Sequence, residues 1–381
     1  MIYLDNAATT KIAPGALEAM LPCLREAYGN PGGKYRLGFE ARKLVNTARD
    51  IIGESLGAVR EEIYFTAGGS ESDNWALKAA AEALRDKGGH IITTAIEHPA
   101  VLRTCRYLEK QGFSVTYLPV DEKGRVEPES VRRAIRPDTI LISVMFANNE
   151  IGTIEPIGEI GAIAREREVL FHTDAVQAYG QLPIDVKALQ IDMLSASAHK
   201  FNGPKGVGFL YVRSGVRLGA LIHGGSQERG RRAGTENVPG IVGMGAAARL
   251  AAAGLSEKMK QEQELRDYLI GRLETEIPNC RLNGDRFRRL PGNVNVSFPG
   301  IEGESLLIML DMEGICASSG SACTSGATEP SHVLTAIGLE PEEARGSLRL
   351  TLSRENTREE MDRTVEVIKG IVERLRSLRE F

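Results

Sequence analysis

Residues 195–206 read Ser-Ala-Ser-Ala-His-Lys-Phe-Asn-Gly-Pro-Lys-Gly, and the interpretation of the whole chain starts from this stretch. Residues 193–198 are apolar or small and predict a short buried strand, while Gly203, Pro204 and Gly206 predict a turn soon after it. Lys200 therefore lies at the carboxyl end of a strand, between an apolar segment and a tight loop. Most lysines in glycine-rich loops are simply solvated, so the meaning of Lys200 depends on its neighbours.

Those neighbours are polar groups suited to holding a charged aromatic cofactor. Ser197 and His199 place two hydrogen-bonding groups beside the amine of Lys200, and Asp174 ends a second apolar strand, predicted over residues 169–174. A buried lysine close to a buried aspartate suits Schiff-base chemistry with pyridoxal phosphate. In that chemistry the aspartate keeps the pyridine nitrogen protonated, which makes the ring an electron sink.

The composition fits a large enzyme and offers no support for nucleic-acid or membrane binding. The chain has 381 residues, 42% of them hydrophobic, and a formal net charge of −4, which allows one large domain and a smaller one. The start of the chain enters a predicted strand without a signal peptide, and no apolar run approaches membrane-spanning length. The five cysteines are scattered without metal-ligand spacing, so we expect a reducing, cytoplasmic compartment and no metal site.

Strands and helices alternate along the first 212 residues, which predicts an α/β fold with a mostly parallel sheet flanked by helices. In such sheets ligands bind beyond the carboxyl ends of the strands. Five polar residues fall at these ends: Ser70, His98, Asn149, Asp174 and Lys200. The predicted strands cover residues 62–66, 90–95, 114–120, 139–146, 169–174, 193–198 and 206–212, and the intervening helices include 14–26, 40–56, 127–136 and 156–167.

Two of these polar residues also have purely structural interpretations. Ser70 and Asp73 have the spacing of a capping box at a helix start, although the preceding Gly68 and Gly69 equally suit a loop that brings backbone N–H groups close to a phosphate. His98 precedes Pro99, which predicts a helix start, so His98 is either an N-cap or an imidazole stacked on a flat ring.

The pattern changes in the last third of the chain and predicts a smaller α+β domain. A helical stretch over residues 239–276, interrupted at Gly254, leads to strands at 293–298, 314–317 and 347–352 and helices at 304–312 and 357–378. We expect a large domain over residues 14–255 and a small domain formed by 1–13 and 256–381. The small domain includes a loop of small polar residues at about 318–328, and residues 223–237 form a basic, glycine-rich loop that suits contact with an anion or a partner subunit.

Taken together and in order, the motifs resemble those of cysteine desulfurases of the nitrogen-fixation and iron–sulfur-cluster type, within the class V aminotransferases, over nearly the whole chain. This resemblance implies the fold of the PLP-dependent transferases that resemble aspartate aminotransferase. The matching segments are Tyr3-Leu-Asp-Asn-Ala-Ala-Thr-Thr10, Phe65-Thr-Ala-Gly-Gly-Ser-Glu-Ser-Asp-Asn74, Glu97-His98, Asn148-Asn-Glu-Ile-Gly152, Asp174-Ala-Val-Gln177, Ser197-Ala-His-Lys-Phe-Asn-Gly-Pro-Lys-Gly206, Glu228-Arg-Gly-Arg-Arg-Ala-Gly-Thr235 and Ser318-Ser-Gly-Ser-Ala-Cys-Thr-Ser325.

The resemblance implies a role for each matching residue. Lys200 would carry pyridoxal 5′-phosphate and Cys323 would take sulfur from L-cysteine as a persulfide, leaving alanine. The resemblance also implies contacts with the cofactor ring by Asp174, Gln177 and His98, of which His98 would also move protons. It implies contacts with the cofactor phosphate by Gly69, Ser70, Ser197 and His199, and by Thr235 from the second subunit of a homodimer. The substrate carboxylate would be bound by Arg349 and by Asn149, which also borders the cofactor.

Some points differ from the family or stay open. The family motif Gly-Asn-Pro-Ser-Ser-x-His is replaced here by residues 29–35, Gly-Asn-Pro-Gly-Gly-Lys-Tyr, which predicts a loosened active-site entrance. A selenocysteine lyase, another class V aminotransferase and a non-catalytic binding platform are the alternatives; Cys323 argues against transamination, and Lys200 with Cys323 against the platform. The sulfur acceptor, an iron–sulfur scaffold or another protein, and transient ligation of a cluster by Cys323 are left open.

Overall fold

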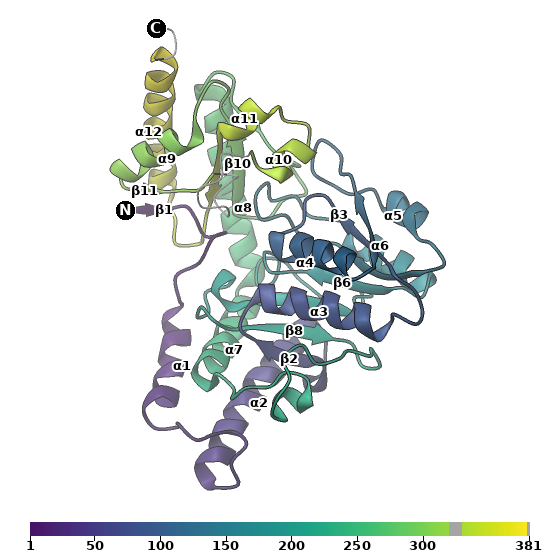
Figure 1. Cartoon of the computed structure of the whole chain (residues 1–381). Coiled ribbons are helices and arrows are strands. Elements are labelled where there is room, and N and C mark those ends of the chain that lie inside the picture. Colours follow the sequence, from purple (N-terminus) through teal and green to yellow (C-terminus); the bar gives the residue numbers. More distant parts are fainter. Residues whose placement is uncertain (320–329, 379–381) are drawn as a thin grey trace.

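The computed structural model describes residues 1–319 and 330–378. Its frame is a seven-stranded sheet, part of which is labelled in Figure 1. The strand order is β2-β8-β7-β6-β5-β3-β4, in which β8 is antiparallel to β2 and β7 and the other pairs are parallel. The predicted, mostly parallel sheet is thus confirmed. The strands are β2 (Ile63–Thr66), β3 (His90–Thr94), β4 (Ser114–Leu118), β5 (Thr139–Ser143), β6 (Leu170–Asp174), β7 (Met193–Ser197) and β8 (Gly208–Val212).

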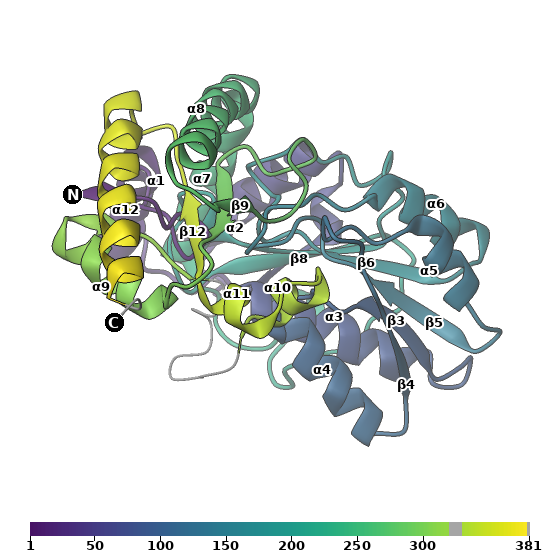
Figure 2. The ribbon, with the colours of Figure 1, turned by 90° about the horizontal axis from the view of Figure 1, so that it is seen from above.

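Helices cover both faces of this sheet because its strands are apolar on both sides (Figure 2). In β7, for example, Met193 joins the core under α3 and α4, while Leu194 joins the core on the opposite face. That opposite face is covered by α1, α2, α5, α6 and α7. The helices are α1 (Pro14–Arg25), α2 (Arg36–Leu56), α3 (Gly69–Ala83), α4 (Pro99–Lys110), α5 (Pro128–Ala134), α6 (Ile157–Glu166) and α7 (Val238–Ala253).

A second, separate core lies in the part of the molecule that contains both termini (Figure 1). It is built on an antiparallel sheet of order β12-β10-β9 and a parallel pair, β1 with β11, and it includes Leu4 from the start of the chain. The elements of this core are β1 (Ile2–Tyr3), α8 (Leu255–Glu276), β9 (Arg281–Leu282), β10 (Asn293–Ser297), α9 (Gly303–Met312), β11 (Ile315–Cys316), β12 (Ser347–Thr351) and α12 (Arg358–Ser377). The short helices α10 (His332–Ala336) and α11 (Pro341–Arg345) belong to a smaller cluster with Ile96, Met145 and Ile151.

Most predicted boundaries agree with the structure within three residues, and the exceptions have local causes. The helix expected from residue 40 begins at Arg36, because Gly38 packs its bare backbone against the carbonyl oxygens of Asn30 and Gly33, where a Cβ would come within 2.8 Å. The interruption predicted at Gly254 in the stretch 239–276 is confirmed, since two helices meet there with a bend of 73°. The short α10, α11 and β9 were not predicted.

Among the residues that the structure describes, no single helix is long and apolar enough to cross a membrane, and only the bent pair α7 and α8 together reaches that length and composition.

Candidate active site

The carboxyl ends of four neighbouring strands border one cavity of about 390 Å³. The chain that leaves β7, β6, β5 and β3 carries Lys200, Asp174, Asn149 and His98, respectively, and all four line the cavity. Ser70, in the first turn of α3 after β2, lines it too. The five polar residues predicted at one edge of the sheet therefore surround one cavity.

Two distant parts of the chain form the remaining walls. One is the N-terminal segment with Asp5, Ala7 and Ala8; the other is β12, through Arg349. The Arg349 guanidinium donates from Nη2 to Asp5 Oδ1 at 2.9 Å and from Nη1 to the carbonyl oxygen of Asn149 at 3.1 Å. Its buried Nε has no partner among the described residues, so Arg349 borders the cavity with one donor unsatisfied.

Lys200 ends a single 3₁₀ turn, Ala198–Lys200, that directly follows β7. Its Nζ donates to the carbonyl oxygens of Ala7 at 2.5 Å and Ala8 at 2.9 Å. The expectation that this lysine is buried was wrong: it is half-buried, because the cavity borders its side chain. The N-terminal segment thus fixes the direction of the amine into the site.

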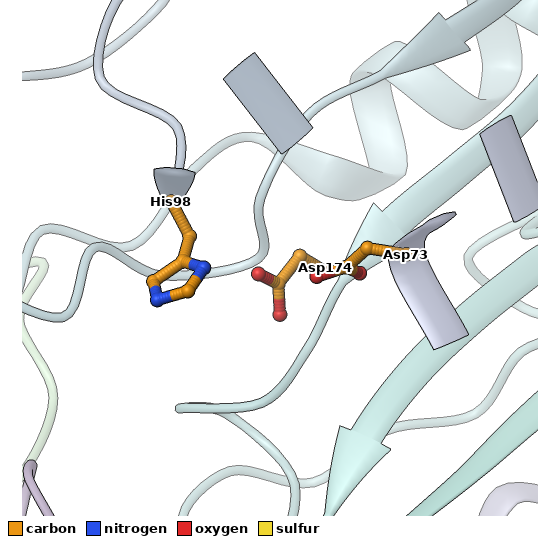
Figure 3. Close-up of side chains that lie close together, drawn as sticks. All are labelled: Asp73, His98 and Asp174. Carbon is orange, nitrogen blue, oxygen red and sulfur yellow. The ribbon is translucent and has the colours of Figure 1, made fainter. Parts of the chain in front are cut away.

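Two carboxylates and an imidazole among the residues lining the cavity form a tight cluster (Figure 3). One ligand atom from each of Asp73, His98 and Asp174 lies within 4.8 Å of the others, and the imidazole of His98 faces the Asp174 carboxylate. Burial raises the pKa of Asp73 and of Asp174, and the Asp174 charge raises the pKa of Asp73 further. Within the described structure Asp73 Oδ1 has no hydrogen-bond partner, so one carboxylate oxygen of the cluster lacks a donor.

The hydrogen bonds of His98 define its tautomer. Its Nδ1 accepts from the backbone N–H of Ala100 at 3.1 Å, which makes His98 the N-cap of α4, as one of the two interpretations of the sequence proposed. In the neutral imidazole the proton must then be on Nε2. Burial lowers the pKa of His98, the Asp174 charge opposes this, and the charges of Lys200 and His332 lower it further, so the neutral form is favoured.

A second cavity, of about 550 Å³, adjoins the first at the start of α3. Both cavities share Gly69, Ser70, Ser197 and His199, and Lys205 lines the second one. A side chain at position 69 would place its Cβ 2.5 Å from Val176 Cγ2, and Gly68 has a φ of 155°. Backbone N–H groups at the start of this 15-residue helix, with a lysine beside them, form a good environment for an anion.

The capping box expected at Ser70 and Asp73 is wrong. The helix begins at Gly69, its N-cap is Gly68, and no side chain caps it. Since the helix starts earlier than the capping pattern requires, Asp73 lies beyond the first turn, too far along the helix to cap it, and lines the cavity instead. Glu71 Oε2 accepts the N–H of Ala67 at 2.9 Å instead.

Three predicted contact residues beside Lys200 also border the cavity. Gln177 Nε2 donates to the carbonyl oxygen of Ala7 at 2.9 Å, and Ser197 is buried between the two cavities. His199 Nδ1 lies 3.2 Å from Thr9 Oγ1, and burial lowers the pKa of His199 to about 4. His199 is therefore neutral at physiological pH and can offer a hydrogen bond.

Other predicted residues do not meet at this cavity within one chain. Thr235 is exposed and lines neither cavity, and residues 32–35 of the loop before α2 also line neither cavity. Cys323, the expected nucleophile, lies outside the described residues, as does most of the loop at 318–328. Ser318, at the start of that loop, lines the cavity.

The sequence interpretation missed two acids, Asp73 and Asp5, and one signal for Asp73 was present. Asp73 shares a helix face with Ala76, Leu77 and Ala80, all of them buried, and an acid within an apolar stripe is unusual unless it faces a site. Asp5 belongs to a motif that was noted, but its pairing with Arg349 has no local signal, because 344 residues separate the two.

Comparison with known proteins gives the family to which this fold and site belong. The family described as aminotransferase class-V matches residues 2–364, and the chain belongs to this family. A cysteine desulfurase IscS from Methanosarcina thermophila is 58% identical over 377 residues, covering 99% of this chain and 93% of that protein.

Two solved structures extend the comparison. A NifS-like protein superposes with a TM-score of 0.92 at 42% identity, covering 98% of this chain and 99% of that one. SspA in complex with cysteine gives a TM-score of 0.83 at 41% identity, covering 93% and 99%. Both confirm the α/β fold and the family resemblance that the sequence motifs indicated.

Proposed function

We propose that this chain is a cysteine desulfurase that uses pyridoxal 5′-phosphate to convert L-cysteine into L-alanine and an enzyme persulfide on Cys323. The observation that carries the proposal is the arrangement of Lys200, Asp174 and His98 around one cavity, in a chain 58% identical to a cysteine desulfurase over 99% of its length. The persulfide would pass to an iron–sulfur scaffold or another sulfur-acceptor protein.

The chemistry of the cavity residues fits this cofactor. The second cavity offers glycines, a helix start and Lys205 to a phosphate, and it adjoins the cavity that holds Lys200. The orphaned Asp73 Oδ1 and the Asp174 carboxylate suit the protonated nitrogen of a pyridine ring. Asp73, His98 and Asp174 also have the spacing of a metal site, but the adjoining phosphate environment and the amine of Lys200 favour the organic cofactor.

Each of these residues then has one task. The cofactor supplies an electron sink that stabilises the carbanion left on the substrate. Lys200 would hold it covalently through Nζ, Asp174 would keep its ring nitrogen protonated, and Gln177 would contact the ring oxygen. The neutral His98, with its proton on Nε2, would stack on the ring and move protons.

The substrate would be oriented by its carboxylate. Arg349 borders the cavity next to Asn149, and its Nε has no acceptor among residues 1–319 and 330–378. A guanidinium binds a carboxylate with two parallel hydrogen bonds. Because Arg349 Nη2 is paired with Asp5, the substrate carboxylate would share or displace that contact. Asn149 would contribute its side-chain amide.

The sulfur transfer would need no external oxidant. The thiolate of Cys323 attacks the sulfur of the substrate, a sulfur–sulfur bond forms, and the substrate Cβ–S bond breaks. The electron pair of that bond remains on the three-carbon product, which is protonated to alanine. Cys323 is thereby oxidised to the persulfide level while the carbon skeleton is reduced.

The same proposal includes the domain division and the oligomer. We assign the large domain to residues 14–255 and the small domain to 1–13 with 256–381, in agreement with the separate cores. The exposed Thr235 would complete the phosphate site of the second subunit of a homodimer. The described cysteines are all free thiols, in agreement with a reducing, cytoplasmic location.

The test is a product assay with two variants. Purified protein supplied with pyridoxal phosphate and L-cysteine should yield alanine and, with a reductant, sulfide in equal amounts. Lys200→Ala should lose the cofactor adduct that borohydride traps, and Cys323→Ala should keep the adduct but lose persulfide and nearly all alanine. Transamination products from the wild type, or full activity of Cys323→Ala, would refute the proposal.

A further inference from the structure

The five-residue helix α10 begins at His332, shortly after residues 320–329, which lie outside the described structure. Two side chains fix the first turn of this helix. The first is Ser331, the N-cap, whose Oγ accepts from the N–H groups of Val333 at 3.2 Å and Leu334 at 3.3 Å. The same hydroxyl donates a short hydrogen bond to Glu150 Oε2. Glu150 directly follows Asn149, which lines the cavity, and both Ser331 and Glu150 are buried.

The second fixed side chain is His332. Its Nε2 lies 3.0 Å from the carbonyl oxygen of Glu97, and because a carbonyl only accepts, Nε2 must carry a proton. Glu97 directly precedes His98, so His332 contacts the backbone that positions the imidazole in the cavity. Burial lowers the pKa of His332, which leaves it neutral and hydrogen-bonded at physiological pH.

The apolar side of α10 packs behind the same two strand ends. Val333, Leu334 and Ile337 form a buried cluster with residues that flank the cavity residues in sequence or line the cavity, namely Ile96, Met145 and Ile151. Polar and apolar contacts thus hold α10 against the backbone around His98 and Asn149.

The other end of the segment is also fixed to a cavity residue. Ser318 forms a two-way backbone bridge with Arg349, in which the Arg349 N–H donates to the Ser318 carbonyl at 2.7 Å and the Ser318 N–H donates back at 3.1 Å. The chain therefore leaves the described structure next to Arg349 and returns next to Asn149 and His98. In sequence, Cys323 lies between these two anchors.

We propose that Ser331 and His332 are positioning residues for sulfur transfer: together they fix the C-terminal anchor of the chain that carries Cys323 to the backbone beside Asn149 and His98. This inference rests on the proposed function, because it concerns the step in which Cys323 accepts sulfur. It assigns the two residues no contact with substrate or cofactor.

The position of the anchor sets the scale of the effect. Val333, Leu334 and Ile337 stay packed against Ile96, Met145 and Ile151 when the two polar side chains are removed, so the variants change the alignment of this anchor without releasing it. Loss of alignment at the reacting sulfur can reach about a hundredfold.

The experiment pairs each disruptive variant with a conservative one in the full-length, cofactor-loaded enzyme. Ser331→Ala removes the hydroxyl and Ser331→Thr keeps it; His332→Leu removes the donor and His332→Gln places an amide N–H near the position of Nε2. Thr335→Ala, at an exposed residue on α10, is the control for the helix itself. The readouts are the single-turnover rate of persulfide formation on Cys323 by mass spectrometry, the absorbance change of the cofactor with L-cysteine, and the melting temperature.

We expect Ser331→Ala with His332→Leu to slow persulfide formation by up to about a hundredfold through misalignment at the reacting sulfur, while the absorbance response to L-cysteine keeps its midpoint. Ser331→Thr with His332→Gln should restore the rate. An unchanged rate in the disruptive pair, or a loss of cofactor or of the absorbance response, would overturn the inference, and so would a slow rate in the conservative pair. A wild-type enzyme that forms no persulfide on Cys323 would instead refute the proposed function, and the inference with it.

Discussion

Two buried clusters of charged residues differ in how their charges are compensated: one pairs Arg49 with Glu228, and the other groups Asp73, His98 and Asp174. Arg49 and Glu228 form a two-pronged ion pair in which both N–O distances are 2.7 Å, and Glu228 also accepts the N–H of Phe65 at 3.0 Å. In the cluster of Asp73, His98 and Asp174, two like-charged carboxylates lie close together, and Asp73 Oδ1 has no hydrogen-bond partner within the described chain, its nearest imidazole nitrogen being His172 Nε2 at 3.7 Å.

This difference in compensation separates charged residues that stabilise the fold from charged residues that are available to bind a ligand. The Arg49–Glu228 pair is satisfied from within the chain, and it holds Glu228 and Arg229 at the unusual φ values of 47° and 59°, in the loop that leads to Thr235. The acidic cluster is incomplete by itself, since buried carboxylates without cations lose stability. We infer that the first cluster shapes a loop and the second is completed by a bound cation, here the cofactor ring nitrogen.

The largest effect should come from Asp174. Asp174→Asn removes the charge that would face the ring nitrogen while preserving size, so we expect turnover of L-cysteine to fall by about a hundredfold or more, because electrostatic contacts with the reacting system are the largest catalytic contribution. Steady-state alanine production measures this. Near-normal turnover in the variant would contradict the assignment of Asp174 and remove the contrast between the clusters.

The second effect should fall on stability. Glu228→Gln leaves the buried Arg49 charge unpaired, and breaking one side of such a pair costs about 3–5 kcal/mol. Urea unfolding of Glu228→Gln and of the double variant Arg49→Met with Glu228→Leu measures this, and the double variant should lose less because no charge stays buried. If the single variant is as stable as the wild type, this pair is not the stabilising cluster we describe.

The third prediction concerns pH. Burial raises the pKa of Glu97, next to His98, to about 8 from 4.5. The folded state therefore binds this proton more tightly than the unfolded state, so its contribution to stability is complete below pH 4.5 and is lost as the pH rises through about 8. Glu97→Gln should remove this pH dependence, which amounts to a fall in the free energy of unfolding of up to about 1.4 kcal/mol per pH unit in that window. Urea unfolding of both proteins at several pH values tests this, and parallel curves would contradict it.

The smallest effect should come from a loop outside both clusters. Gly32→Ser meets only Asn30 Oδ1 at 3.2 Å, and Gly33→Ser requires the exposed Tyr35 ring to move from 2.5 Å. Because these residues line neither cavity, we expect the free energy of unfolding to change by no more than ~0.5 kcal/mol. The KM for cysteine should change by about twofold at most, and the products should be identical. A change of product would mean that this loop takes part in the chemistry.

The site was predictable where it depends on strand ends. Lys200, Asp174, Asn149 and His98 each follow an apolar strand, and neighbouring parallel strands end at the same edge of a sheet, so their convergence followed from a local pattern and one rule of topology. The prediction that Asp73 belongs to a capping box was wrong, because the helix begins at Gly69, before Ser70, and no side chain caps it. The short α10 was overlooked because five residues are too few for a periodic signal.

The sequence by itself determined the fold class, the order of strands and helices and the residues that meet at the sheet edge, because hydrophobic periodicity and turn residues act over a few positions. Only the tertiary structure decided which of these groups are paired. Arg349 meets Asp5 across 344 positions, and Ser331 meets Glu150 across 181. Such contacts depend on tertiary packing within and between the domains, and no local pattern encodes the distance between side chains that the packing brings together.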